Sequence, residues 1–472
     1  MRAVSMRSFK SDTRSENITS KSSSDDILEN ADFDEFLQAT CKKFQCPTAI
    51  VVGRETVREP PPKSSKQRQE SRSKRGAAMD VLPTPSTQNL SYLNPFDEKY
   101  LLVMAIYDTL NHLIEILLSK YNDQVIPRVL MQLIALKVPH TRHLTKFTIR
   151  QCRIDLYTIY ELNKILVLSN ITDICLDHSY VKEGIYDVLL SQKSSLRNLS
   201  LSRCYINDQV CERIAARLRR SEPAEASLLT LNLSSNQITD EGMKHLGEAL
   251  RDNRHLRYLN VSDNQISDVG AQYVFDVLQE FLLTQEEIFD RRKCYVQYLK
   301  KKTELYELYL SKFEEENSKR LAAKRSLTGR PRLSPKKDKV SIRRDSRHST
   351  SSILSVKARS MVLEILGPFQ HPFSPAMAVV KDGDLYCIGN FTLCYLNLRY
   401  NNLTYKSVDA LLTVVKHQKI YRTENQCGLV SVLIEGNHVP EDCIEYALIH
   451  KEMMRSVTRR KLPGDKSVPS SR

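Results

Sequence analysis

One short pattern recurs along this 472-residue chain and constrains its fold more than any other feature. Residues 228–238 fit the template L-x-x-L-x-L-x-x-N-x-I/L, and the template returns 28 residues later at 256–266. A fixed period of about 20–50 residues is the signature of a protein built from stacked structural repeats. Weaker copies of the template begin at Leu144, Ile171 and Leu196, and near the C-terminus at Leu393 and Leu429.

Each position of the template has a physical reason. The alternation L-x-L places one face of a short strand in a core and the other face toward solvent. The Asn that follows is expected to bond backbone groups of the turn, because a buried polar group without partners costs about 1–3 kcal/mol. Cys, which is small and weakly polar, can take the same position. This predicted structural ladder consists of Cys152, Cys204, Asn236, Asn264, Asn401 and Asn437.

Helices are expected after the turns. Thr239 and Asp240 precede an apolar pair at Leu246 and Leu250, and residues 267–278 repeat this arrangement. Thr, Ser and Asp are good helix caps, and the i, i+4 spacing of the apolar residues is typical of a helix with one buried face. We therefore predict an α/β solenoid, with parallel strands on its concave side and helices on its convex side.

These residues resemble leucine-rich repeats, and the runs at 238–242 and 266–270 resemble the ribonuclease-inhibitor-like subclass. The order of parts also resembles the leucine-rich repeat-containing protein 71 family. That resemblance implies a non-enzymatic intracellular protein associated with motile cilia or flagella, and it transfers no ligand residue to this chain. The stretches that carry it are residues 32–37, 229–266, 277–292, 381–384 and 396–403.

Composition divides the rest of the chain. Residues 1–95 are predicted to be a largely disordered tail, since they are rich in Ser, Lys, Arg and Pro. A short helical motif at 26–44 either docks on a partner, forms a transient helix or caps the first repeat. The remaining predicted segments are a helical N-terminal cap (96–140), repeats (141–279), a long helix (280–318), a disordered basic insert (319–360), a return segment (361–390), C-terminal repeats (391–454) and a basic tail (455–472).

The insert carries most of the net charge of +14, since residues 319–360 hold fourteen Lys or Arg and two Asp. It is interpreted either as a solvated linker or as a contact for acidic protein tails such as those of tubulin. Nucleic-acid binding is disfavoured, because the segment has no aromatic residue on which bases could stack. Ser334 and Ser346 are candidate phosphorylation sites, because each lies beside residues that protein kinases prefer. Phosphate would weaken an electrostatic contact there.

Several function classes are excluded. The N-terminal residues lack the apolar run of a signal peptide, and no stretch is a convincing membrane span. Eleven scattered cysteines without a CxxC pair indicate reduced thiols in an intracellular protein. No nucleotide-binding, hydrolase or metalloprotease motif is present. We therefore expect no enzyme, no cofactor, no metal and no membrane.

Partner binding is predicted on the outward-facing strand positions of the concave side, where the alternative is a plain solvated surface. The first hypothesis is a protein-interaction module or scaffold in the cytoplasm. The second is a structural part of an axoneme or other cytoskeletal assembly, and the third, a nuclear protein bound to nucleic acid, is the weakest. The candidate binding residues are Arg150, Asp173, Asp177, Asn198, Asn232, Tyr258, Asn260, Tyr395, Asn397 and Arg399.

One architectural prediction joins the two groups of repeats. If they form a single stack, the strand at 395–399 pairs in parallel with the strand at 258–262, despite about 130 intervening residues.

Overall fold

The structure is a computed structural model that describes residues 31–57, 100–327, 342–423, 426–440 and 443–458. It divides into two compact units. Unit 1 contains the described residues up to 275 together with those from 391 onward, and unit 2 contains those between 276 and 390. Each unit is described by itself.

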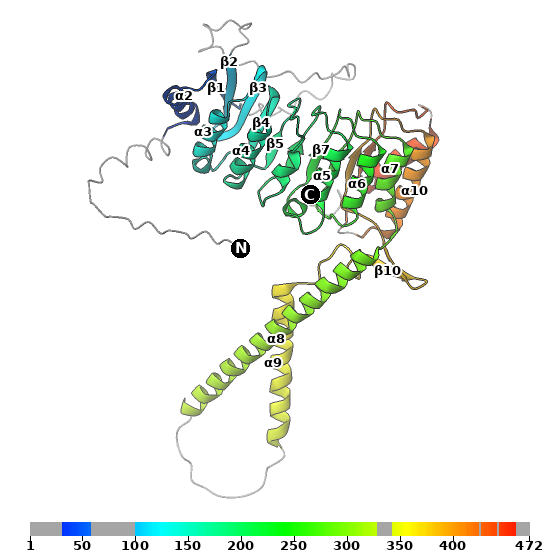
Figure 1. Ribbon diagram of the computed structural model, residues 1–472. Coiled ribbons are helices and arrows are strands. Elements are labelled where there is room, and N and C mark those ends of the chain that lie inside the picture. Colours follow the sequence, from blue (N-terminus) through cyan, green and yellow to red (C-terminus); the bar gives the residue numbers. More distant parts are fainter. Residues whose placement is uncertain (1–30, 58–99, 328–341, 424–425, 441–442, 459–472) are drawn as a thin grey trace, which may run out of the picture. The chain divides into compact units, whose positions relative to one another are not determined.

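A ten-stranded sheet organises unit 1 (Figure 1). All neighbouring strands are parallel except β2 and β3, which are antiparallel. The last seven strands coincide with the seven copies of the template. In spatial order the strands are β1 (Ala49–Thr56), β2 (Tyr100–Tyr107), β3 (Leu113–Val125), β4 (Lys146–Arg153), β5 (Asp173–Cys175), β6 (Asn198–Ser200), β7 (Thr230–Asn232), β8 (Tyr258–Asn260), β12 (Tyr395–Asn397) and β13 (Ser431–Leu433).

The predicted pairing of distant strands is confirmed. Strand β12 lies beside β8 in parallel, with Tyr395 opposite Tyr258 and Asn397 opposite Asn260. Residues 276–390 are thus inserted between two neighbouring strands of one sheet.

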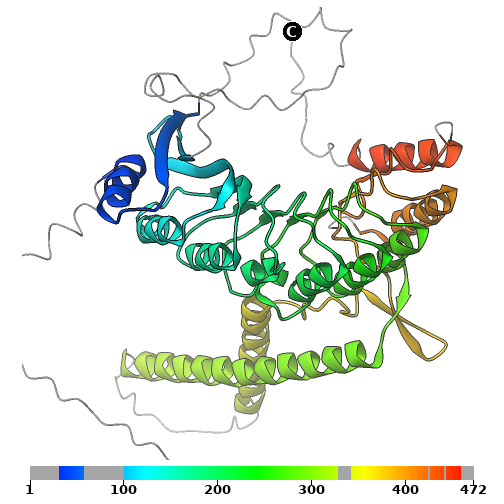
Figure 2. The same cartoon turned by 45° about the horizontal axis from the view of Figure 1, so that its top comes forward.

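Helices lie along one side of this sheet (Figure 2). The step from β5 to β6 is the shortest between copies, and there the 3-10 helix η2 (Tyr186–Leu190) stands where other repeats have an α-helix. The α-helices are α2 (Phe33–Lys43), α3 (Arg128–Lys137), α4 (Leu156–Val167), α5 (Asp208–Leu218), α6 (Asp240–Leu250), α7 (Asp268–Leu278), α10 (Tyr405–Tyr421) and α11 (Ile444–Thr458), and two further 3-10 helices are η1 (Val138–His140) and η3 (Pro223–Ala226).

The Asn residues of the ladder join each coil to the preceding one. Asn236 accepts hydrogen bonds from the N–H groups of Cys204 and Ile206 at 2.9 and 3.1 Å, and its amide donates to the carbonyls of Leu201 and Leu233 at 2.9 Å. Cys204 makes fewer hydrogen bonds than Asn236 does. Its thiol donates to the carbonyl of Leu176 at 3.2 Å. With a further bond to the carbonyl of Ser234 at 3.2 Å, the buried amide of Asn236 bonds five backbone groups, and the thiol bonds fewer.

The residue before each ladder position adopts a left-handed backbone conformation. This is uncommon for residues other than Gly, yet it recurs in all seven coils with φ between 53° and 79°. The same sharp turn therefore follows every repeat strand. The residues are Gln151, His178, Arg203, Ser235, Asp263, Tyr400 and Gly436.

The N-terminal end corrects two predictions. The helical cap expected at 96–140 is wrong for most of its described residues, because 100–107 and 113–125 form β2 and β3. The helices in this described part are α3 and the 3-10 helix η1. A short apolar run such as that of β2 does not distinguish a strand from a buried helix by periodicity. The largely disordered tail expected at 1–95 contains the strand β1, while α2 falls within the helical motif predicted at 26–44. Residues 1–30 and 58–95 lie outside the described part. Helix α2 packs against β1 and α3, which agrees with capping of the sheet end among the three alternatives for residues 26–44.

Unit 2 consists of the long helix α8 (Gln285–Leu327), helix α9 (Ile342–Leu366) and a three-stranded antiparallel sheet. Its strands are β10 (Ala378–Lys381), β11 (Asp384–Cys387) and β9 (Phe281–Leu282). The return segment predicted at 361–390 thus contains the end of α9 and two of these strands.

The disordered insert predicted at 319–360 is wrong for residues 319–327 and 342–360, which are helical, and residues 328–341 lie outside the description. Helices α8 and α9 contact each other (Figure 1), and Phe313, Ala358 and Val362 are buried. The ammonium group of Lys357 lies 4.1 Å from the ring centre of Phe313. The boundary predicted at residue 360 falls inside α9 and separates the apolar residues of its buried face. The helical spacing was therefore not recognised from the sequence.

None of the helices in the described residues combines the length and the apolar character that a bilayer span requires.

We predict that Asn401→Ala lowers the free energy of unfolding by roughly 2–4 kcal/mol, because it leaves several buried backbone groups without partners. Asn401 is buried, accepts from the N–H of Ile266 at 3.1 Å and donates to the carbonyl of Val261 at 3.0 Å. Urea unfolding followed by circular dichroism measures the loss. The control is Asn397→Ala, a half-buried residue of the same coil, where less than about 1 kcal/mol is expected. Equal losses in both variants would contradict the ladder's role.

Candidate functional site

The repeat strands place their flanking side chains on the face of the sheet away from the helices. In β5, β6, β7 and β8 the central residue is buried and its two neighbours are half-buried. Residues paired in register across parallel strands point to the same face. We call this surface the open face.

The structure brings the ten predicted binding residues onto this face. One row across the sheet contains Asp173, Asn198, Tyr258 and Tyr395, and the next contains Asn232, Asn260 and Asn397. Arg150 lies within β4, three residues before its end, and Asp177 and Arg399 lie two residues beyond β5 and β12.

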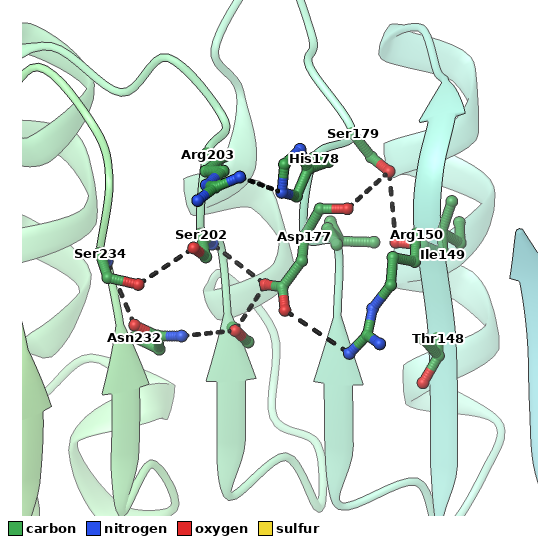
Figure 3. Close-up of polar contacts among 12 residues, drawn as sticks. Thr148, Ile149, Arg150, Asp177, His178, Ser179, Ser202, Arg203, Asn232 and Ser234 are labelled. Carbon is green, nitrogen blue, oxygen red and sulfur yellow. Dashed lines mark hydrogen bonds and ion pairs between the residues drawn. The ribbon is translucent and has the colours of Figure 1, made fainter. Parts of the chain in front are cut away.

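Asp177 is the centre of a polar network (Figure 3). Its Oδ1 accepts from the hydroxyl of Ser200 at 2.6 Å and from the N–H of Ser202 at 3.1 Å. Its Oδ2 lies 3.9 Å from Nη2 of Arg150. Arg150 and Asp177, two of the predicted binding residues, therefore form an ion pair that bridges two coils.

The network extends toward the middle of the sheet. The amide of Asn232 donates to the hydroxyl of Ser200 at 2.9 Å, and the hydroxyls of Ser234 and Ser202 are 3.0 Å apart (Figure 3). In the row beside it, the amide of Asn198 donates to Asp173 at 2.6 Å. These side chains fix one another in place, so the polar half of the open face is preorganised.

Two tyrosines form the aromatic part of the face. The ring centres of Tyr258 and Tyr395 lie 6.1 Å apart, and Tyr395 is 45% exposed. A Tyr side chain offers a large apolar area with a polar end, and Tyr is enriched at the energetic centres of protein interfaces. A hollow of about 290 Å³ adjoins Tyr258, and it is lined by Lys146, Asp173, Asn198, Thr230, Asn232 and Asn260 among others.

The structure gives Arg399 an ion-pair partner that the sequence analysis did not identify. Nε of Arg399 lies 2.6 Å from Oε2 of Glu435 on the next coil. The hydrogen bond from Arg399 lowers the pKa of Glu435 below its ordinary value. The pair could have been found from the register, because Arg399 and Glu435 hold the same position in successive copies of the template.

Three side chains of unit 2 have the chemistry of metal ligands: Asp290 and Cys294 on α8, and His371 after α9. Their ligand atoms lie within 4.8 Å of one another. However, Nδ1 of His371 accepts from the N–H of Phe373 at 3.0 Å, so the proton of the neutral ring is on Nε2, which lies 3.4 Å from Asp290. A metal at Nε2 would need the other tautomer. The cluster is thus a hydrogen-bonded pair with a nearby thiol.

The ladder cysteines are free thiols inside the core. Burial raises the pKa of Cys152 to about 11 and that of Cys204 to about 12, so both are neutral at physiological pH. Neither has the thiolate character that nucleophilic chemistry requires.

The two candidate phosphorylation sites cannot be placed in the same way. Ser334 lies outside the described residues, and Ser346 lies in α9 at a position whose side chain is not described.

We predict that the Arg399–Glu435 pair stabilises unit 1 only while Glu435 is ionised. Because the pKa of Glu435 is lowered in the folded state, this stability is present above the ordinary Glu value and is lost as the pH falls through the folded value. At pH 7 the free energy of unfolding of wild type should exceed that of Glu435→Gln by less than about 1 kcal/mol, since the side chains of Arg399 and Glu435 are both partly exposed. The difference should shrink as the pH is lowered from the ordinary Glu value toward the lower folded value.

Urea unfolding at pH 7 and at successively lower pH values measures this difference. In an Arg399→Met background, Glu435→Gln should have a smaller effect at each pH, since of the two side chains that lower the pKa of Glu435 only Tyr446 then remains. An undiminished difference in that background would contradict the assignment.

The comparisons with known proteins bear on the repeats. A family model described as Leucine Rich repeat matches residues 226–247, 252–275 and 389–412. These segments contain β7 with most of α6, β8 with most of α7, and β12 with the first half of α10. No curated protein matches the chain. The chain therefore contains leucine-rich repeats within a mixed α/β fold that has a parallel sheet, and domains of this kind generally mediate protein–protein interaction.

Proposed function

We propose that unit 1 is a non-enzymatic leucine-rich repeat solenoid that binds a protein partner through its open face. The observation that carries this proposal is the uninterrupted row of outward side chains across strands β4 to β12. The row joins a preorganised polar network around Asp177 to the aromatic pair of Tyr258 and Tyr395.

This arrangement favours a protein partner over a small molecule. The polar groups of the face are largely bonded to one another, as with Asp173 and Asn198. Small-molecule sites instead bury most of their ligand in an apolar pocket with a few convergent polar groups. A broad face with aromatic and Arg side chains is typical of the energetic centre of a protein interface.

We predict that the double variant Tyr258→Ala/Tyr395→Ala loses its partner. Truncating aromatic anchors at the centre of an interface costs about 2 kcal/mol or more, which is roughly a 30-fold loss of affinity. Quantitative proximity labelling with the intact chain, wild type against variant, measures the loss. The matched control is Tyr205→Ala, because Tyr205 is 64% exposed but lies beyond strand β6 at a turn.

The proposal requires proteins that are lost with the double variant and kept with the control. If both variants label the same proteins as wild type does, the open face is not the binding surface.

We propose as a second function that the basic stretch at 319–360 contacts acidic protein tails such as those of tubulin, which would make the chain a structural part of an axoneme. The net charge of +12 in this stretch supports it, and so does the resemblance to the leucine-rich repeat-containing protein 71 family. The resemblance to the ribonuclease-inhibitor-like subclass bears on the architecture of the repeats and not on their partner. Cytoplasmic localisation, and the cilium or flagellum within it, is part of this proposal. Nine of the fourteen basic residues lie in α8 and α9 and five at 328–341, and attraction between charges, unlike a groove, requires no fixed shape in the partner.

We predict that the intact chain co-sediments with microtubules, and that removing the tubulin tails by limited proteolysis abolishes this. Binding should also fall steeply as ionic strength rises, because contacts between exposed charges are screened. A test variant replaces Arg330, Arg332, Lys336, Lys337 and Lys339 by Gln, which removes five of the fourteen basic residues of the stretch, and it should bind intact microtubules more weakly than wild type does. Equal binding to intact and tail-free microtubules would contradict the proposal.

A further inference from the structure

The N-terminal edge of the sheet in unit 1 differs from its other edge. Strand β1 is the end strand among the described residues and is eight residues long, whereas β13 at the opposite edge has three. Long edge strands are usually protected by charges, Pro, bulges or a covering segment, because they offer unpaired backbone groups to another chain. Residues 49–53 of β1 are Ala, Ile, Val, Val and Gly, which provide neither charge nor Pro.

The direction of the free backbone groups follows from the pairing with β2. In a parallel pair, the N–H and C=O of one residue point to the same neighbouring strand, and those of the next residue point away. The N–H of Val57 donates to the carbonyl of Tyr107 in β2 at 2.9 Å. By alternation, the backbone groups of Ile50 and Val52 point outward. A hydrogen bond supports this direction: the carbonyl of Val52 accepts from the side chain of Gln38 on α2 at 3.3 Å.

A groove of about 470 Å³ lies along this edge. One wall is helix α2, with Gln38, Cys41 and Lys42, and the other is β1, with residues 49–52. The far end of the helix is tied to the sheet, since Arg54 contacts Asp32 at 2.8 Å and the hydroxyl of Tyr107 donates to Asp34 at 2.8 Å. The groove therefore has two fixed walls, one helical and one with a free strand edge.

The charges of the groove indicate its occupant. Lys42 is exposed in the lining, and the structure gives it no carboxylate partner among the described residues, while Asp32 and Asp34 are engaged by Arg54. Lys43 lies next to it on the same helix end, and Phe44, which is 55% exposed, adds apolar surface there. A complementary segment carries aliphatic side chains and a carboxylate at that end.

We propose that the groove between α2 and β1 binds an extended acidic–aliphatic segment of a partner protein, which adds to the sheet as a further strand beside β1. Backbone bonds to Ile50 and Val52 would supply affinity, and the side chains that enter the groove would supply specificity. This site is distinct from the open face and does not depend on the function proposed for it.

The experiment uses the full chain and synthetic seven-residue peptides of alternating Val and Thr. One peptide has two Glu at its amino end and one has them at its carboxyl end, which covers both strand directions. Matched peptides have Lys in place of Glu, or N-methyl groups on alternate backbone amides. Fluorescence anisotropy measures binding, and mass spectrometry measures how far each peptide protects Cys46, a groove-lining thiol, from alkylation.

We expect one Glu peptide to bind saturably and to protect Cys46. N-methylation should weaken binding at least about tenfold, because the paired edge of the peptide loses its donors. Lys42→Glu should weaken the Glu peptide about three- to tenfold and strengthen the Lys peptide. Val52→Pro should weaken both, since it removes an outward N–H at a place where an edge strand tolerates Pro.

Three results would overturn the proposal. The first is no saturable binding of any peptide to the intact chain, and the second is equal binding of the N-methylated peptide. The third is a concentration-dependent dimer that Val52→Pro dissociates, because a second copy would then occupy the edge. Lys42→Glu changes an exposed side chain, so its result stays interpretable even if Val52→Pro fails to fold.

Discussion

The structure of unit 1 depends on one constraint: a coil of this kind cannot satisfy its own buried backbone. The strand of each repeat is three residues long in most copies, and the turn after it exposes carbonyl and N–H groups to the core. The neighbouring coil supplies the partners, through the parallel strand bonds and through the ladder amides. Asn264, for example, bonds the carbonyls of Leu233 and Val261 on two successive coils. Stability therefore comes from stacking, as expected for repeat proteins.

The same constraint shapes the open face. Because the central residue of each strand points into the core, its two neighbours must point outward, and the in-register stacking aligns them across the sheet. Nothing in the ladder restricts the identity of these outward residues. They are consequently free to serve recognition, which is how a Tyr pair and an Asp-centred network can lie on an otherwise regular scaffold.

The repeats could be predicted because their signal is periodic and local. The seven copies, the ladder residues and the outward positions all followed from one spacing. The Arg399–Glu435 pair follows from the same spacing, once equivalent positions in successive copies are compared. The N-terminal end could not be predicted in this way, since β2 is apolar on both faces and its length and composition do not separate strand from helix. Strand β1 pairs with β2 across 43 intervening residues, a long-range contact that no local pattern encodes.

The insertion of unit 2 also follows from the ladder. An insertion can occur between two coils of a stack wherever the coil after it can still bond the free backbone groups of the coil before it. Asn401 does this, because it bonds Val261 and Ile266, which lie 140 and 135 positions before it in the sequence. On the helix side, Asp268 accepts from the N–H and hydroxyl of Thr404 at 2.8 and 2.6 Å. These bonds close the stack on both sides of the sheet. Unit 2, inserted between these two coils, has buried residues of its own between α8 and α9.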